Sequence, residues 1–114
     1  MESHSLTDLA AEHLGMARQA KNGRSADTLY GGSGHSLRQV LMALCAGQEL
    51  AEHDSPGEAT LLVVTGQVRL TVHAETSTPN NWEGTAGDLV AIPPARHGLV
   101  ALTDAVVLLS VVKA

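Results

Sequence analysis

Aromatic side chains are almost absent from this sequence. Its 114 residues include no phenylalanine, one tryptophan and one tyrosine. A site that stacks bases or sugar rings on several aromatic side chains is therefore not expected. There is also a single cysteine, Cys45, so the chain cannot form an internal disulfide, which agrees with a reducing compartment.

Basic residues and long apolar runs are scarce too. Seven Lys and Arg stand against twelve Asp and Glu, and the seven are spread along the chain instead of forming a patch. Nucleic-acid binding needs such a patch, so we expect no nucleic-acid partner. No apolar run is long enough to span a bilayer, and the first residues lack the pattern of a signal peptide. We therefore expect a cytoplasmic protein with no membrane partner.

The first part of the sequence has a helical pattern. Ser5 and Asp8 have the spacing of a capping box, and apolar residues then recur at helical intervals. The pattern predicts an amphipathic helix from about Leu6 to Lys21 that ends before Gly23, a residue suited to a helix C-cap. His13 on this helix is expected to be exposed to solvent.

Beyond residue 24 the helical period disappears, and turn signals recur at intervals of roughly ten residues. Short runs rich in Val, Leu and Thr lie between the turns, at residues 37–46, 60–65, 67–73, 89–92, 99–102 and 105–112. Regular short strands of this kind predict an all-β sandwich or barrel. With 44% apolar residues, the chain has material for one core. We therefore divide it into a helix and linker, residues 1–24, and one barrel domain, residues 25–114.

Two of the predicted strands, "TLLVV" and "AVVLLSVV", do not alternate between apolar and polar residues. Antiparallel strands that are apolar on both faces must be covered on both faces. The barrel interior covers one face, and either the N-terminal helix or a second subunit can cover the other. Both remain open at this point, and we expect a homodimer.

Two segments each place a histidine at a short distance after a glycine. In the first, five residues separate Gly47 from His53; in the second, "GDLVAIPPARHG", five residues separate Gly87 from Pro93, and His97 follows. In this order, with a β-rich segment between them, the segments resemble the two motifs of the cupin superfamily. The resemblance implies a double-stranded β-helix, the cupin or jelly-roll barrel, here preceded by the amphipathic helix.

The resemblance covers about residues 37–112 and departs from the family at several positions. Ser55 stands where the first motif has its second histidine, and Ala59 stands where it has glutamate. In the second motif Ala95 replaces a glycine, His97 comes one position early, and no asparagine follows.

These departures bear on metal binding. In metal-dependent cupins the two motifs supply three histidines and a glutamate to a divalent cation, whereas here only His53 and His97 remain. Two imidazoles hold a metal weakly. Glu58 is a possible third ligand if a bulge at Pro56 and Gly57 turns it inward, since a regular strand would point it to the opposite face. We expect a divalent transition metal (Zn, Mn, Fe or Ni) to be absent or weakly bound.

Other polar side chains are candidates for the pocket. Arg38 and Gln39 precede the first motif, and strand alternation directs one of them inward, where it would anchor an acidic or polar ligand. The sequence does not show which one. His53 and His97 are also candidates for proton transfer to a bound molecule, because imidazole titrates near neutrality.

Three functions remain open, and whether the protein is an enzyme is left undecided. We expect a small-molecule-binding or sensing barrel with an incomplete metal site. The first alternative is a metal-dependent enzyme of the oxygenase or isomerase type, acting on a small polar molecule. The second is a protein-interaction module whose barrel is filled. The first function needs an open pocket, the enzyme needs converging titratable groups, and the module needs an exposed apolar surface.

Overall fold

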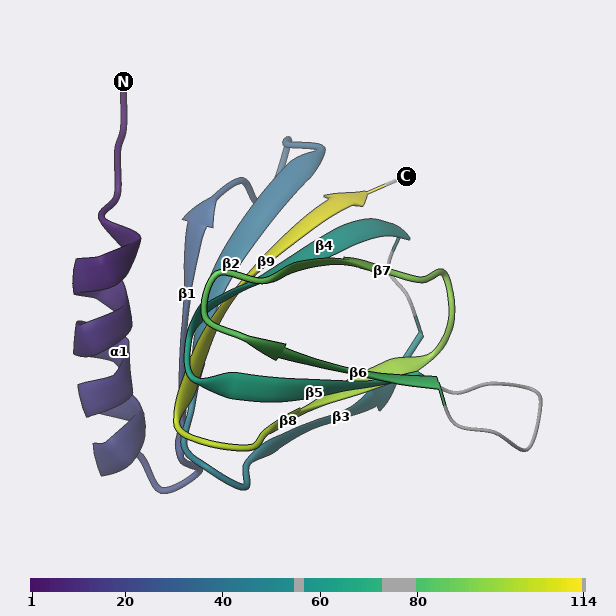
Figure 1. Ribbon diagram of the computed structural model, residues 1–114. Helices are drawn as coiled ribbons and strands as arrows, with labels where there is room; N and C mark the ends of the chain where they lie inside the picture. Colours follow the sequence, from purple (N-terminus) through teal and green to yellow (C-terminus); the bar gives the residue numbers. More distant parts are fainter. Residues whose placement is uncertain (55–56, 73–79, 114) are drawn as a thin grey trace.

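The computed structural model describes residues 1–54, 57–72 and 80–113, and this part of the chain contains one helix and nine strands (Figure 1). The elements are α1 (Leu6–Gln19), β1 (Arg24–Tyr30), β2 (Leu37–Leu44), β3 (Glu49–His53), β4 (Gly57–Thr65), β5 (Gln67–Val72), β6 (Asn80–Thr85), β7 (Leu89–Ile92), β8 (His97–Ala101) and β9 (Ala105–Lys113).

The strands form two sheets that face each other. The five-stranded sheet has the order β1-β2-β9-β4-β7, and the four-stranded sheet has the order β3-β8-β5-β6. Neighbouring strands are antiparallel. The arrangement confirms the predicted all-β jelly-roll barrel with one N-terminal helix.

The main core lies between the two sheets. On β5, Val68 and Leu70 are buried, whereas Gln67, the first residue of the strand, is exposed, as the alternation of this strand predicts. Inward residues of β2, β4, β7, β8 and β9 complete the core, which contains Leu44, Ala59, Leu61, Val63, Val68, Leu70, Ile92, Leu99, Ala101, Ala105, Val107 and Val111. These residues identify the side of each of these six strands that faces the interior of the barrel.

The helix begins where the capping box predicts. The Ser5 side chain accepts a hydrogen bond from the backbone N–H of Asp8 at 3.2 Å. The helix ends at Gln19, two residues before the expected end at Lys21, and the chain then turns through Gly23, which has a φ of 65°. Within the described residues no helix is long and apolar enough to cross a bilayer.

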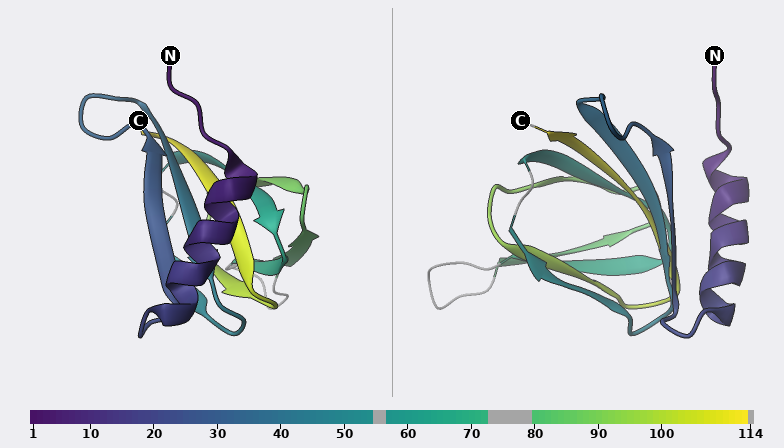
Figure 2. Two further views of the ribbon diagram at one scale, coloured as in Figure 1. Left: turned by 90° about the vertical axis from the view of Figure 1, so that its left-hand side faces the viewer. Right: turned by 180° about the vertical axis from the view of Figure 1, so that it is seen from behind.

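The helix covers part of the outer face of the five-stranded sheet (Figure 2). Ala10, Leu14 and Ala17 form a second core with the sheet residues Leu41, Ala43 and Val106. Val106 lies on β9 between inward-facing Ala105 and Val107, so this strand is buried on both faces. The helix therefore covers part of the two-sided apolar strands from within the same chain.

A second contact fixes the lower end of the helix to the barrel. The Asp104 carboxylate accepts a hydrogen bond from the Ala46 backbone N–H at 2.8 Å and two from the Arg18 guanidinium at 3.1 and 2.9 Å. The Ala46 bond, followed by the contact with Arg18, holds the pKa of Asp104 below its ordinary value. Three separate segments of the chain thus meet at one carboxylate.

The helix also buries a histidine, and the expectation that His13 is exposed was wrong. Its exposed fraction is 6%, and its Nδ1 lies 2.6 Å from Ser25 Oγ on β1. Its Nε2 lies 3.7 Å from an Asp27 carboxylate oxygen. Ser25 and Asp27 are two apart on one face of β1, so a strand that the sequence did not reveal supplies polar partners for a histidine beneath the helix.

Candidate functional site

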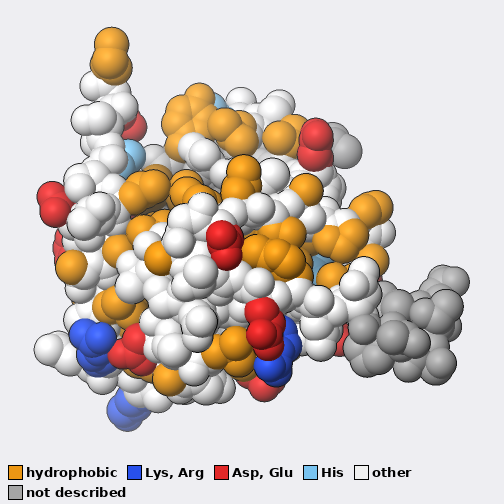
Figure 3. All heavy atoms as spheres, viewed as in Figure 1, with side chains coloured by type: hydrophobic (Ala, Val, Ile, Leu, Met, Phe, Trp, Pro, Cys, Tyr) orange, Lys and Arg blue, Asp and Glu red, His pale blue; other side chains and the backbone are white. Residues whose placement is uncertain are grey.

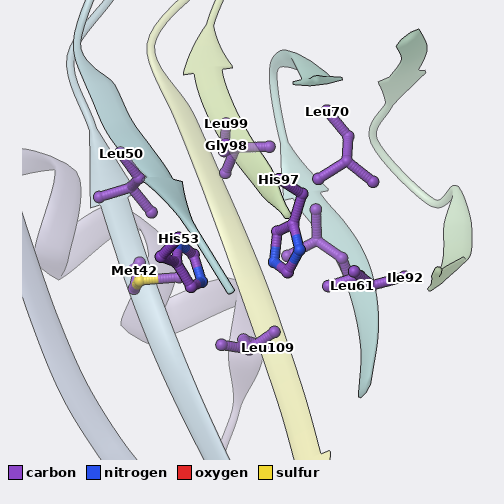
Figure 4. A pocket seen from close by; sticks show the side chains of 10 residues that line it. All are labelled: Met42, Leu50, His53, Leu61, Leu70, Ile92, His97, Gly98, Leu99 and Leu109. Carbon is purple, nitrogen blue, oxygen red and sulfur yellow. The ribbon is translucent and has the colours of Figure 1, made fainter. Parts of the chain in front are cut away.

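Two histidines meet at one end of the barrel. His53 is the last residue of β3, His97 is the first residue of β8, and the two are register partners. Their ring centroids are 4.5 Å apart, and the ring planes are inclined by 61°. The two motif histidines, 44 positions apart in the sequence, thus lie side by side (Figure 4).

The two rings border a cavity of about 40 Å³ between the sheets, which we call the histidine cavity. Apart from the rings its walls are apolar. The five-stranded sheet contributes Met42, Leu61, Ile92 and Leu109, and the four-stranded sheet contributes Leu50, Leu70, Gly98 and Leu99. The two imidazoles are the titratable groups that line it among the described residues. A bound molecule would therefore meet hydrocarbon on most sides and imidazole on one.

Hydrogen bonds to the backbone favour one tautomer of each neutral ring. Nδ1 of His97 lies 2.9 Å from the Ala95 carbonyl oxygen, and Nδ1 of His53 lies 3.2 Å from the Ala51 carbonyl oxygen. A carbonyl oxygen only accepts, so each Nδ1 carries the proton and donates it. In the neutral ring Nε2 is then unprotonated and has a free lone pair. Both imidazoles are prepared as acceptors or as ligands.

The two histidines differ in exposure. His97 is 5% exposed, whereas His53 is in contact with solvent. Gly98, next to His97, permits the close approach of the strands on either side. A Cβ at this position would lie 3.0 Å from the Leu50 carbonyl oxygen and 3.1 Å from Thr71 Oγ1. The absence of a side chain at Gly98 therefore lets β3 and β5 close around the start of β8.

Charged residues flank the histidine pair outside the cavity. The Arg96 guanidinium lies 3.6 Å from the Glu52 carboxylate and 3.7 Å from the Asp54 carboxylate, and it donates a hydrogen bond to the Glu52 carbonyl oxygen. Arg96 is half exposed, so these ion pairs are screened and weak. They connect the residues on both sides of His53 to the residue before His97.

Glu58 does not reach the cavity. β4 keeps unbroken register with β9 from Gly57 to Val63, so no bulge turns Glu58 inward within that range. Pro56, the other residue of the expected bulge, lies outside the described residues. Its neighbour Ala59 is buried in the core, whereas Glu58 is exposed. The carboxylate lies on the outer face of the five-stranded sheet, as strand alternation requires.

The structure also settles the alternation of Arg38 and Gln39. Gln39 lies on the outer face, where its amide donates a hydrogen bond to Ser110 Oγ at 3.1 Å. Arg38 shares the inward parity of Met42 but is exposed, and it does not line the histidine cavity. Neither residue joins His53 and His97.

The donor set does not fit the four-ligand site of metal-dependent cupins. Within residues 1–54, 57–72 and 80–113, no group of three or more His, Cys, Asp and Glu side chains is arranged to hold a metal ion. His53 and His97 provide two nitrogen ligands, and the remaining coordination would fall to water. Two neutral imidazoles give no charge neutralisation to a divalent cation.

Comparisons with known proteins identify the architecture. No protein-family model matches the sequence, and no curated protein matches it. Among solved structures, an RmlC-like cupin from Desulfovibrio desulfuricans is 20% identical with a TM-score of 0.70, over 98% of this chain and 96% of that chain. An RmlC-like cupin from Shewanella frigidimarina is 26% identical with a TM-score of 0.67, over 82% and 78% of the two chains.

A conserved protein of unknown function from Streptococcus pyogenes is also similar. It is 26% identical with a TM-score of 0.70, over 83% of this chain and 78% of that chain. These similarities extend over most of the barrel.

Proposed function

We propose that this chain, which has the fold of RmlC-like cupins, binds a small molecule in its barrel at His53 and His97 without a tightly held metal. The observation that carries the proposal is the pairing of the two imidazoles, 4.5 Å apart, at the end of an apolar cavity. Each ring has its Nδ1 proton engaged by a carbonyl and its Nε2 lone pair free.

This chemistry selects a ligand with an apolar body and a hydrogen-bond donor. A hydroxyl group or an undissociated acid can donate to Nε2 of either ring, while the leucine walls favour hydrocarbon. The cavity, at about 40 Å³, has room for a group of a few atoms. The ligand is therefore a small molecule or the end of a longer one whose remainder extends past exposed His53.

Metal-dependent catalysis is the second candidate, supported by the two histidines alone. A metal bound by two imidazoles would dissociate readily, and chelators would remove it. The proposed binding of a small organic molecule needs no metal, so metal content separates the two functions.

We also propose that the chain forms a homodimer through the uncovered part of the outer face. Strand register places Leu41, Leu108, Leu62 and Leu89 in one row across β2, β9, β4 and β7. Leu41 is fully buried beneath the helix, whereas Leu89, at the other end of the row, is 65% exposed. An apolar row that continues from a helix-covered region into solvent is suited to contact with a second copy.

A ligand screen tests the proposed function. Thermal unfolding is measured with a set of alcohols and phenols, and separately with Zn, Mn, Fe and Ni. We expect some of the organic compounds to raise the Tm of the wild type, because a ligand that binds the folded state stabilises it. The His53→Ala, His97→Ala double variant should lose these shifts.

His4→Ala is the matched control, since His4 lies in the exposed N-terminal segment. It should retain the shifts of the wild type. Equal shifts in the double variant and the wild type would exclude a role for the histidine pair in binding.

A further inference from the structure

A second cavity lies beside the histidine cavity, between β1, β2 and the beginning of β3. It has a volume of about 260 Å³, and we call it the side groove. Its lining residues are Asn22, Arg24, Ser25, Ala26, Met42, Ala43, Leu44 and Leu50. In strand register Arg24 is opposite Leu44 and Ala26 is opposite Met42, so the inward faces of β1 and β2 form its floor.

The side groove adjoins the histidine cavity. Met42 and Leu50 line both of them, one from each sheet. Met42 is partly exposed, and an unbranched thioether side chain adapts readily to a neighbouring molecule. Ala26, Leu44 and Leu50 add aliphatic side chains to the lining, whereas the Ser25 hydroxyl is in contact with His13.

Two unused hydrogen-bond donors lie at one end of this groove. Within the described part of the chain, the Arg24 guanidinium has no ion pair or hydrogen bond. The Asn22 side-chain oxygen accepts a hydrogen bond from the Arg24 backbone N–H at 3.1 Å, which leaves the amide NH2 as a donor. Figure 3 shows basic side chains at the lower edge of the molecule, where α1 ends.

From this combination we infer that the side groove is a binding site for an aliphatic carboxylate. The carboxylate pairs with the Arg24 guanidinium and the Asn22 amide, and the hydrocarbon chain lies along Ala26, Met42, Leu44 and Leu50. A planar guanidinium matches a carboxylate with two parallel hydrogen bonds. A monoanion suits the site because Arg24 is the one basic residue among the described residues that line the groove, in a chain whose net charge is −5. The inference goes beyond the proposed function and does not depend on it.

Isothermal titration calorimetry with hexanoate, octanoate and hexan-1-ol tests the inference. We expect saturable binding of both carboxylates, with octanoate tighter by about two- to fourfold for each added methylene that the groove buries. In the His53→Ala, His97→Ala double variant, which lacks the imidazoles of the histidine cavity, hexan-1-ol has the same chain as hexanoate without the charge. It should bind there at least about tenfold more weakly than hexanoate, as a charged hydrogen-bonded pair requires.

Two variants locate the site. Arg24→Gln should weaken octanoate binding by about tenfold or more while the Tm stays close to that of the wild type, because Arg24 is exposed and unpaired. Arg69→Gln is the matched control, since Arg69 is a strand arginine that pairs with Glu83 away from the groove. It should bind octanoate as the wild type does.

Filling the groove provides an independent check. Ala26→Leu adds hydrocarbon at an exposed position on the floor and keeps Arg24, so it should weaken octanoate more than hexanoate by competing for space. The inference is overturned if octanoate does not bind, if hexan-1-ol binds as tightly as hexanoate, or if Arg24→Gln and Arg69→Gln have the same affinity.

The test also separates this site from the histidine cavity. The His53→Ala, His97→Ala double variant should bind octanoate with unchanged dependence on Arg24. If the ligand shifts prove not to depend on the histidines, only the proposed function fails. If octanoate does not bind, only the side-groove inference fails.

Discussion

His53 and His97 are cross-strand partners, with ring centroids 4.5 Å apart and each Nδ1 hydrogen-bonded to a backbone carbonyl two residues earlier. Backbone geometry therefore holds both rings in one tautomer and orientation before any ligand arrives. Pre-organised groups of this kind reduce the free-energy cost of binding.

The two histidines should differ in their contribution to stability. His97→Ala removes a buried ring together with its hydrogen bond to Ala95, so we expect the free energy of unfolding to fall by about 1–3 kcal/mol. His53→Ala removes an exposed ring and should cost less than about 0.5 kcal/mol. Urea unfolding followed by circular dichroism measures both. Equal losses would show that the His97 environment does not stabilise the fold.

The docking of the helix should depend on its buried face. Leu14→Ala removes a side chain packed on the sheet and should lower the free energy of unfolding by about 2–4 kcal/mol. Met16→Ala, on the exposed side of the same helix, should change it by less than about 0.5 kcal/mol. Chemical denaturation compares the two variants. Similar effects of both substitutions would contradict the packing of α1 on the barrel.

Asp104 should make stability pH-dependent in the acid range. Its pKa is lowered in the folded protein, chiefly by the Ala46 N–H and then by Arg18, so the unfolded chain binds a proton more readily. The stabilisation is present above the ordinary value of 3.8 and is lost as the pH falls through the lower folded pKa.

The difference in stability between wild type and Asp104→Asn tests this dependence. Because the Asp104 side chain is about a third exposed, we expect a difference of about 1 kcal/mol near neutral pH, after allowance for solvent screening. The difference should shrink below that value of 3.8. A difference that stays constant with pH would show that the charge of Asp104 is not responsible.

The oligomeric state should respond to the uncovered leucine row. Leu89→Asp places a charge at its exposed end, so we expect the variant to be monomeric by light scattering coupled to size exclusion while the wild type is dimeric. Leu102→Asp, at an exposed position between β8 and β9, is the control and should remain dimeric. A monomeric wild type, or a dimer unaffected by Leu89→Asp, would contradict the proposed interface.

The strands that could be predicted from the sequence differ physically from those that could not. The apolar runs predicted β2, β4, β5, β7, β8 and β9, although β4 and β8 begin earlier than expected. The missed strands, β1, β3 and β6, all lie at sheet edges. An edge strand is exposed on more sides, so its sequence needs no apolar run, and β1 and β3 are mostly exposed.

Some of the candidate site residues could be placed from the sequence, and others could not. Motif spacing singled out His53 and His97, which lie side by side, whereas Glu58, the possible third ligand, points outward as it does in a strand without a bulge. The inward parity of Arg38 and the burial of His13 depend on pairing between distant strands and on β1, which local patterns do not encode. Arg24 fell in the segment expected to be a linker, so its place in a groove needed the register of β1 with β2.

Nitrogen-15 NMR of the histidine side chains, recorded during titration with the compounds that raise the Tm, tests the central proposal most directly. The chain has six histidines, and we expect the free protein to show His53 and His97 protonated at Nδ1. Ligand should then shift the Nε2 resonances of these two rings and leave the exposed His4 unchanged. Shifts absent from His53 and His97 at saturating ligand, or near-stoichiometric metal bound to these rings in the purified protein, would contradict the account.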